Sequence, residues 1–290
     1  MNKFTIGDME NLTGIKAHTL RIWEQRYQLP GTPKRASSGH RFYDNEDLKA
    51  LLRISNLYHS GIKISKIARM DEETIKKLSL GTPEGKSNAE HLLNVLLERS
   101  IDLDHQGFER LIDEGIAAMG MKNLMLQVLF PLLSKLGLFW VTGHIIPSQE
   151  HLASEIIIRK ILSATHELPA VPAATQGRSV VVFTPAGEFH EIPILFAAYL
   201  LRKSGIPYIY FGKSVGLAEL KDLAAHQHFN QLYFHLITNF TRQRLDNYLS
   251  ELHRAFPSCE VYFSGLKPEF QLPQHTYFLE TPSAILSFTS

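Results

Sequence analysis

The chain of 290 residues contains a single cysteine, Cys259, so it can form neither an internal disulfide nor a Cys-rich metal site. We expect Cys259 to pack as a small apolar residue. No uninterrupted apolar run reaches the length that a membrane span requires, and the first residues lack the charged-then-apolar pattern of a signal peptide. The composition is that of an ordinary globular protein, long enough for two or three compact units. We therefore expect a cytoplasmic protein that has no membrane partner.

The charges are unevenly distributed, although the formal net charge is only +1. Residues 1–70 contain 12 Lys and Arg but 6 Asp and Glu, which leaves 18 basic and 23 acidic residues in the remainder. A basic segment attached to a mildly acidic body suggests a polyanionic partner for that segment alone.

The stretch TIGDMENLTG predicts a short helix. Thr5 is its expected N-cap, Asp8 completes a capping box, and Gly14 ends the helix. A tight turn then leads to KAHTLRIWEQRY, which predicts a second helix.

This second helix divides into a buried face and an exposed face. Leu20, Trp23 and Tyr27 recur at helical spacing and form the expected core stripe. The polar face presents Lys16, His18, Thr19, Arg21 and Arg26. Two helices joined by a Gly-containing turn, with a basic face on the second, are typical of a helix-turn-helix, whose second helix enters the major groove of DNA.

A Pro- and Gly-rich segment, LPGTPKRASSGHRFYDNEDL, follows and predicts a small wing, after which a helix starts at Asp44 to Asp47. The expected DNA contacts in the wing are Arg35, His40, Arg41 and Tyr43. Arg and Lys side chains suit phosphate groups, whereas His18, Thr19 and Arg21 are best placed for base edges.

In their joint spacing, FTIGDMENLTGIKAHTLRIWEQRY and SSGHRFYDNEDLKALLRI resemble the MerR-type winged helix-turn-helix over residues 1–75. The resemblance implies a transcriptional regulator that binds a double-stranded DNA operator. MerR proteins usually continue into a long dimerising helix, whereas this chain breaks at Gly81-Thr82-Pro83. We expect a homo-oligomer, a dimer or a tetramer, that does not form through one long coiled coil.

The rest of the chain predicts two further domains. Helical segments near 87–99, 103–119, 122–140 and 148–166 indicate a four-helix bundle over residues 86–166. Over residues 178–290, short apolar runs alternate with amphipathic helices, which is typical of a parallel, doubly wound, flavodoxin-like α/β sheet. Ligands of such sheets bind at the carboxyl ends of the strands, and the loop GEFHEIP, with His190, follows the first strand.

Two motifs in these domains point to one ligand. Glu188-x-His190 resembles the motif of the cobalamin-binding domains of methionine synthase and of CarH/LitR-type repressors, whose histidine is the lower cobalt ligand. Trp140, followed after nine residues by Glu150-His151, resembles the motif that covers the upper face of the cobalamin in those repressors. The resemblance implies a regulator, not an enzyme, that clamps cobalamin between the helical and α/β domains. Adenosylcobalamin, with a light response, is the implied form.

The α/β segment departs from the family's pattern at three positions. Pro193 replaces a glycine, His235 replaces a serine that bonds the displaced base of the cofactor, and Ser264-Gly265 replaces Gly-Gly. His235 could fill the slot meant for the base, or bond to the base. The predicted cofactor-binding residues are Trp140, Glu150, His151, Glu188, His190, His235, Ser264 and Gly265, with His190 as the metal ligand.

Two alternatives stay open at this point. One is a MerR-type regulator whose sensor is degenerate and binds no cobalamin. The other is a corrinoid carrier subunit of a methyltransferase, which the DNA-binding segment argues against. The light response is a separate question, because Val141 stands where the photosensing repressors have a second cobalt-ligating histidine. His144 is the nearest substitute, so we expect a leaky or absent light switch.

Overall fold

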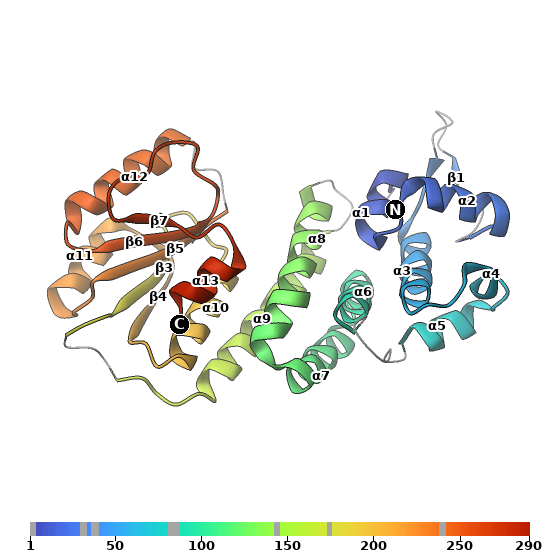
Figure 1. The fold of residues 1–290 in the computed structure, drawn as a ribbon, viewed down its shortest axis with the longest axis horizontal. Coiled ribbons are helices and arrows are strands. Elements are labelled where there is room, and N and C mark those ends of the chain that lie inside the picture. The colour runs from blue at the N-terminus through green and yellow to red at the C-terminus, as the bar shows by residue number, and fades with distance from the viewer. Residues whose placement is uncertain are drawn as a thin grey trace. The chain divides into compact units, whose positions relative to one another are not determined.

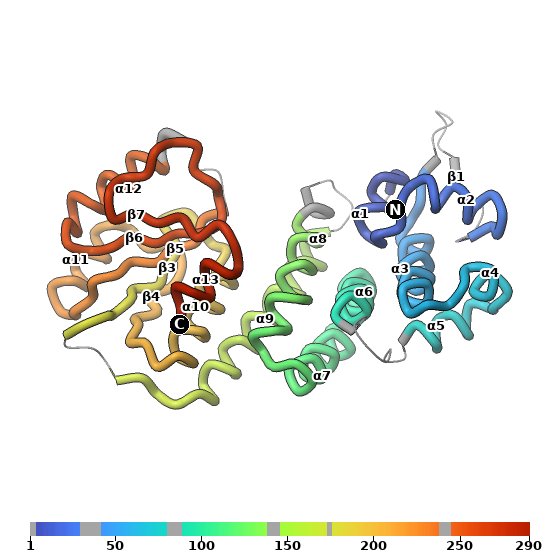
Figure 2. Tube along the Cα trace, viewed as in Figure 1, coloured from blue at the N-terminus to red at the C-terminus, as the bar shows by residue number. Residues whose placement is uncertain are grey.

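The computed structural model describes residues 4–29, 34–35, 41–80, 88–141, 146–172, 176–237 and 242–290. The chain divides into two compact units, Met1–Ile156 and Ile157–Ser290 (Figure 1). The predicted DNA-binding domain and most of the predicted helical bundle therefore lie in one unit. The path of the chain through each unit is traced in Figure 2.

The first two helices form as predicted. Helix α1 spans Ile6–Thr13, and the side chains and backbone of Thr5 and Asp8 make the reciprocal hydrogen bonds of a capping box. It ends at Gly14, whose φ of 72° is in the left-handed region that glycine adopts without strain. Helix α2 spans Ala17–Tyr27.

The predicted wing is a two-stranded antiparallel sheet of β1 (Lys34–Arg35) and β2 (Arg41–Phe42). Asp44 then caps α3 (Asn45–His59) through a second capping box, with Asp47. Two shorter helices follow, α4 (Ile64–Ile67) and α5 (Glu72–Leu80).

The helical segment consists of α6 (Asn88–Ile101), α7 (His105–Leu124), a π-helical turn η1 (Met125–Leu129), α8 (Phe130–Val141) and α9 (Pro147–His166). Helices α6, α7 and η1 pack on one another through residues that include Leu96, Phe108, Ile112 and Val128, all almost completely buried. The four helical segments are therefore confirmed.

One stretch of this segment, His105–Gly137, is long and apolar enough to cross a membrane by length and composition. The expectation that no apolar run reaches that length is therefore wrong. Gly120 interrupts the stretch, because its φ of 76° and ψ of 154° are not helical. Apolar residues on both sides of the break, such as Ile112 and Leu132, are buried inside the protein. A buried apolar face is what we expect of a helix in the core of a helical bundle.

The second unit is built on a sheet of five parallel strands in the order β4-β3-β5-β6-β7. The strands are β3 (Val180–Pro185), β4 (Tyr208–Val215), β5 (Gln231–Leu236), β6 (Glu260–Gly265) and β7 (Thr276–Phe278). The intervening helices are α10 (Ile192–Lys203), α11 (Leu217–His226) and α12 (Arg242–Ala255), and α13 (Pro282–Phe288) ends the unit. The predicted doubly wound sheet is confirmed.

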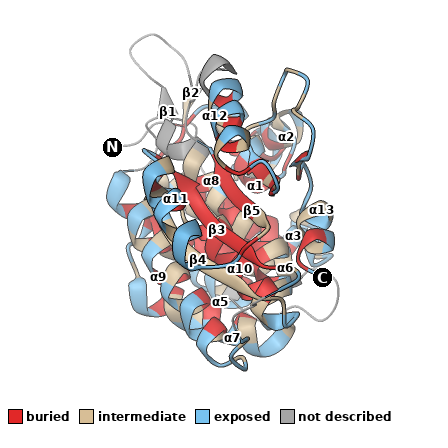
Figure 3. Cartoon of the chain, turned by 90° about the vertical axis from the view of Figure 1, so that its left-hand side faces the viewer, coloured by how far each residue is buried: buried red, intermediate tan, exposed pale blue. Residues whose placement is uncertain are grey.

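Helices cover both faces of this sheet, so its central strands are buried. Ile194 and Ala197 of α10 and Phe288 of α13 pack with Val180 and Val182. Leu220 of α11 and Leu245, Leu249 and Leu252 of α12 pack on the opposite face. Figure 3 shows β3 and β5 as continuous buried ribbons. Cys259 is buried in the second of these clusters, as predicted.

Candidate DNA interface and cofactor site

The polar face of α2 is exposed, as the sequence predicts. Lys16, His18, Arg21 and Arg26 are exposed, and Thr19 is half-buried. The ammonium group of Lys16 lies 2.9 Å from Oε1 of Glu10 on α1. The hydrogen bond from Lys16 lowers the pKa of Glu10. The helix therefore presents a basic face on which one of the five predicted contacts is paired with a carboxylate.

Two packed aromatic rings fix α2 on α3. Trp23 is 3% exposed, and its ring meets that of Tyr58 edge-on, with 5.0 Å between the centroids. Ser55 of α3 donates a hydrogen bond to the carbonyl oxygen of Thr13, at the end of α1. The sequence did not single out Ile22, which is 44% exposed on α2 although it is apolar.

The wing gives a different result for Tyr43. It is 2% exposed, its backbone pairs with that of Phe4, and its hydroxyl donates a hydrogen bond to Glu24 of α2. The predicted DNA contact through Tyr43 is therefore wrong, because the ring is part of the core that attaches the wing to α2. Arg35 and Arg41 are register partners across the wing. Their side chains, and the whole of His40, lie outside the described residues.

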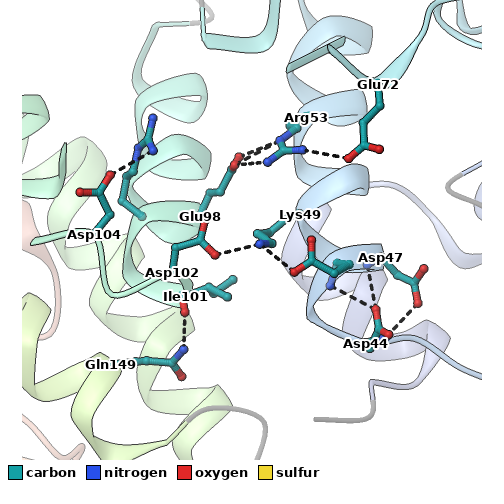
Figure 4. Close-up of polar contacts among 12 residues, drawn as sticks. Asp44, Asp47, Lys49, Arg53, Glu72, Glu98, Ile101, Asp102, Asp104 and Gln149 are labelled. Carbon is teal, nitrogen blue, oxygen red and sulfur yellow. Dashed lines mark hydrogen bonds and ion pairs between the residues drawn. The ribbon is translucent and has the colours of Figure 1, made fainter. Parts of the chain in front are cut away.

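Polar contacts connect α3 of the winged helix-turn-helix to α6 of the helical segment (Figure 4). Nε of Arg53 lies 3.1 and 3.3 Å from the two carboxylate oxygens of Glu98. One turn earlier on α3, Nζ of Lys49 lies 2.8 Å from Oδ1 of Asp102. Glu98 lies in the last turn of α6 and Asp102 directly follows the helix, so the end of α6 is attached to α3 of the DNA-binding segment.

The start of α9 is attached to the end of α6 in a similar way. The side-chain amide nitrogen Nε2 of Gln149 donates a hydrogen bond to the carbonyl oxygen of Ile101 at 2.6 Å, as Figure 4 shows. The next two residues are the predicted cofactor contacts Glu150, which is half-buried and accepts a hydrogen bond from Ser154, and His151, which is exposed. Trp140 lies in the last turn of α8, but its side chain is outside the described residues.

The Glu188-x-His190 motif follows β3, at the carboxyl end of the sheet. Glu188 is fully buried, and Oε1 accepts hydrogen bonds from the backbone nitrogen of His190 at 2.9 Å and from its Nδ1 at 2.6 Å. The other carboxylate oxygen accepts from the backbone nitrogen of Ile237, at the end of β5, at 2.9 Å. The imidazole is about half exposed. A carboxylate on Nδ1 fixes the tautomer in which Nε2 carries the lone pair that ligates a metal.

The loop that carries this motif is held at several points. The hydroxyl of Thr184 donates to the carbonyl oxygen of Glu188 at 2.6 Å, and the backbone nitrogen of Ser214 donates to the same oxygen at 3.1 Å. The hydroxyl of Ser214 accepts from the backbone nitrogen of Gly187. Gly187 has a φ of 85°, a conformation that glycine adopts at no steric cost. The carboxyl ends of β3 and β4 thus hold the loop that carries His190.

Two residues joined to this motif through the backbone carry exposed apolar side chains. Phe189, before His190, is 65% exposed, and Ile237, whose backbone holds Glu188, is 51% exposed. Pro193 lies in the first turn of α10, where its missing N–H leaves no helical hydrogen bond unmade. Within the described residues, no group of three or more His, Cys, Asp or Glu is arranged to hold a metal ion.

The three remaining predicted residues lie together at the ends of β5 and β6. His235 pairs in register with Ser264, and Leu236 pairs with Gly265. Nδ1 of His235 and Oγ of Ser264 are 2.7 Å apart. Burial lowers the pKa of His235 to about 4, so its imidazole is neutral at pH 7.

Comparison with known proteins matches two segments of the chain to two family models. The family model "MerR HTH family regulatory protein" matches residues 4–74, and the family model "B12 binding domain" matches residues 92–162. The HTH-type transcriptional repressor CarH of Myxococcus xanthus is 27% identical over 223 residues, which are 75% of this chain and 73% of that protein. The repressor CarA of the same organism is 25% identical over 217 residues, or 74% and 70% of the two chains.

A solved structure supports the fold of the C-terminal part. The monomethylamine corrinoid protein of Methanosarcina barkeri superposes with a TM-score of 0.52 at 13% identity, over 69% of this chain and 97% of that one. At this identity the likeness concerns the fold alone. The two family matches and the two related repressors support the assignment of the chain as a MerR-family transcriptional regulator with a cobalamin-binding sensor module.

Proposed function

We propose that this regulator binds operator DNA through α2 and the wing, and that its sensor binds a cobalamin through His190. The observation that carries the second part is the Glu188–His190 pair, a fully buried carboxylate that holds an exposed imidazole by Nδ1 at 2.6 Å. The pair needs no rearrangement to present Nε2 to a metal, because the loop is already fixed by β3, β4 and β5.

A corrinoid fits the residues around His190. Its cobalt accepts one axial imidazole, and its ring has a wide apolar surface. Phe189 and Ile237 offer exposed apolar side chains next to the imidazole, where burial under a ring would stabilise the complex. Glu188 would orient the imidazole and increase its basicity as a ligand.

For the DNA-binding half, the exposed basic face of α2 supports the proposal. Arg21 and Arg26 provide guanidinium groups for phosphates and base edges, and His18 and Thr19 lie on the same helix. The contacts Arg35, His40 and Arg41 remain proposals from the sequence. Trp140, Glu150 and His151, in the other unit, remain proposed contacts with the cofactor.

Absorption spectroscopy of the purified chain with cobalamin tests the sensor. We expect the base-off, histidine-ligated spectrum in the wild type, and its loss together with weaker binding in His190→Ala. His226→Ala removes an exposed histidine from α11 and should change neither. A wild-type spectrum identical to that of free cobalamin at saturating protein would favour the degenerate sensor instead. Gel shifts with palindromic promoter fragments at low salt test the DNA-binding half, and no retardation there would contradict it.

The methyltransferase carrier predicts the same spectrum, so spectroscopy does not separate it from a regulator. Retardation of DNA by the full chain does, because a carrier subunit has no reason to bind an operator. The adenosyl form is tested in the same titration, by comparing the affinities for adenosylcobalamin and hydroxocobalamin.

A further inference from the structure

Hydrogen bonds through Ser264 join three polar side chains of β5 and β6, and two of them, His235 and Ser264, lie near the carboxyl ends of the strands. Oγ of Ser264 lies 2.7 Å from Nδ1 of His235 and 2.7 Å from the hydroxyl of Tyr233. None of the three residues is more than 9% exposed. Tyr233 and His235 are two residues apart on one strand, so their side chains lie on the same face of the sheet. These three residues form what we call the β5–β6 network.

The backbone behind this network is equally tight. Gly265 has a φ of 99°, and a Cβ built on it would lie 2.1 Å from the carbonyl oxygen of Leu236 and 3.0 Å from Cε1 of His235. The ends of the two strands therefore leave no space for a single added carbon at that point. The closest contact would be with the backbone of β5, so only glycine fits at this position.

This filled edge lies next to the proposed cobalt ligand. Ile237, two residues after His235, donates its backbone N–H to the carboxylate that holds His190. The pKa of His235, which burial lowers, is raised in part by the carboxylate of Glu188. The buried β5–β6 network thus adjoins, along β5, the backbone that holds Glu188.

The chemistry of corrinoids makes this relevant to specificity. A complete cobalamin carries its own base, on a nucleotide tail, at the lower coordination position of cobalt. A protein histidine that takes this position displaces the base, which stays tethered on the histidine's side of the ring. The free energy of breaking that bond must then be offset by contacts of the displaced base with the protein.

We propose, on the basis of the proposed function, that this sensor recognises the corrin ring without its nucleotide and prefers corrinoids that lack the lower base. The β5–β6 network fills the strand ends beside His190 with side chains that already satisfy one another. The displaced base of a cobalamin gains no buried site there, whereas a corrinoid without a base has nothing to displace except a water. His235 and Ser264 are the specificity-determining residues.

Titration of the full chain with diaquocobinamide and with aquocobalamin tests the proposal. Both compounds have the same ring, and only the second has the nucleotide and its base. We expect cobinamide to bind more tightly, by about tenfold, with a histidine-ligated spectrum that His190→Ala removes. Cobalamin binding as tightly as cobinamide, or more tightly, would overturn the proposal. If neither compound acquires a histidine-ligated spectrum, the proposed function itself fails.

The double variant His235→Ser/Ser264→Gly tests the cause of the preference. It removes the bulk of the network, so we expect the ratio of the two dissociation constants to shift towards cobalamin. Tyr277→Phe, on the edge strand β7 and outside the network, should leave the ratio unchanged. Circular dichroism shows whether the double variant folds, and an unchanged ratio in a folded double variant would overturn the role of the two residues. The wild-type ratio decides the main proposal even if that variant does not fold.

Discussion

Arg53 of α3 and Glu98 of α6 form an ion pair in which the two side chains are 9% and 6% exposed. Desolvation by burial opposes the charged form of Arg53, and the hydrogen bond with Glu98 offsets it, so the pKa of Arg53 is raised overall. Two oppositely charged side chains that are buried together change the free energy of folding little relative to an apolar pair. A single buried charge without its partner lowers stability strongly. The pair therefore fixes which surfaces of α3 and α6 meet.

We predict that Glu98→Gln lowers the free energy of unfolding by about 3 kcal/mol, because it removes the buried counter-charge of the Arg53 guanidinium. The remaining carboxylate, Glu72, lies 3.7 Å away and is 85% exposed, so solvent screens it. Urea unfolding followed by tryptophan fluorescence measures this, since both tryptophans, Trp23 and Trp140, lie in the first unit. The matched control is Glu46→Gln in the same unit, which breaks an ion pair with Lys49 in which the carboxylate side chain is 76% exposed. That change should cost less than about 1 kcal/mol. Equal losses in the two variants would contradict the prediction.

The second prediction concerns DNA. Arg21→Ala should weaken operator binding and, if Arg21 contacts a phosphate, reduce the slope of log K against log salt by about 0.9. If Arg21 instead contacts a base, affinity should fall most for the specific sequence, with the salt slope little changed. Gel shifts or fluorescence anisotropy at several salt concentrations distinguish the two.

The control removes the same charge elsewhere. Lys221→Ala, at an exposed position of α11 in the second unit, should leave DNA affinity unchanged. If Arg21→Ala behaves like Lys221→Ala at every salt concentration, α2 is not the recognition helix.

The helices and strands could be predicted because their signals are local. The capping boxes at Thr5 and Asp44 and the stop at Gly14 are visible in the sequence, and the structure contains all three. The alternation of strands and helices after residue 178 likewise specifies a parallel sheet before any contact is known. The position of Glu188 and His190 just after a strand is visible for the same reason, and the structure joins the two by a hydrogen bond, whereas their role as a cofactor site stays a prediction.

Contacts between distant segments determine the features that the sequence alone did not predict. Tyr43 follows a basic wing and looks like a DNA contact. Its ring is buried because its backbone pairs with that of Phe4 and its hydroxyl donates a hydrogen bond to Glu24. The hydrogen bond between His235 and Ser264 joins residues 29 apart in the chain. No local pattern in the sequence indicates that these two substitutions face each other on adjacent strands.

The third prediction is a loss of stability in acid that depends on His235. Its pKa is about 4 in the folded protein and 6.5 in an ordinary environment, because burial disfavours the charged ring. Between these values the unfolded chain binds a proton that the folded chain does not, so stability falls as the pH decreases from 6.5 to 4. The loss from this residue is at most about 3 kcal/mol.

Reactivity of the buried thiol of Cys259 measures opening of the second unit, which contains the chain's one cysteine. A pyridyl disulfide reagent, which also reacts in acid, should label wild type progressively faster than His235→Gln as the pH falls. Comparison of the two proteins at each pH cancels the pH dependence of the reagent itself. A constant ratio of labelling rates from pH 7 to pH 4 would contradict the prediction.

The last prediction concerns light. Helix α8 ends at Val141, directly after Trp140, and an aliphatic side chain cannot ligate cobalt. The nearest histidine in sequence, His144, lies outside the described residues, between α8 and the start of α9 at Pro147. We therefore expect that illumination of the adenosylcobalamin complex removes the adenosyl group without producing a stable bis-histidine spectrum. Absorption spectra before and after illumination measure this.

Val141→His supplies an imidazole at the missing position and should produce the stable spectrum. A long-lived bis-histidine spectrum in the wild type would contradict the prediction, and its loss in His144→Ala would identify His144 as the substitute ligand.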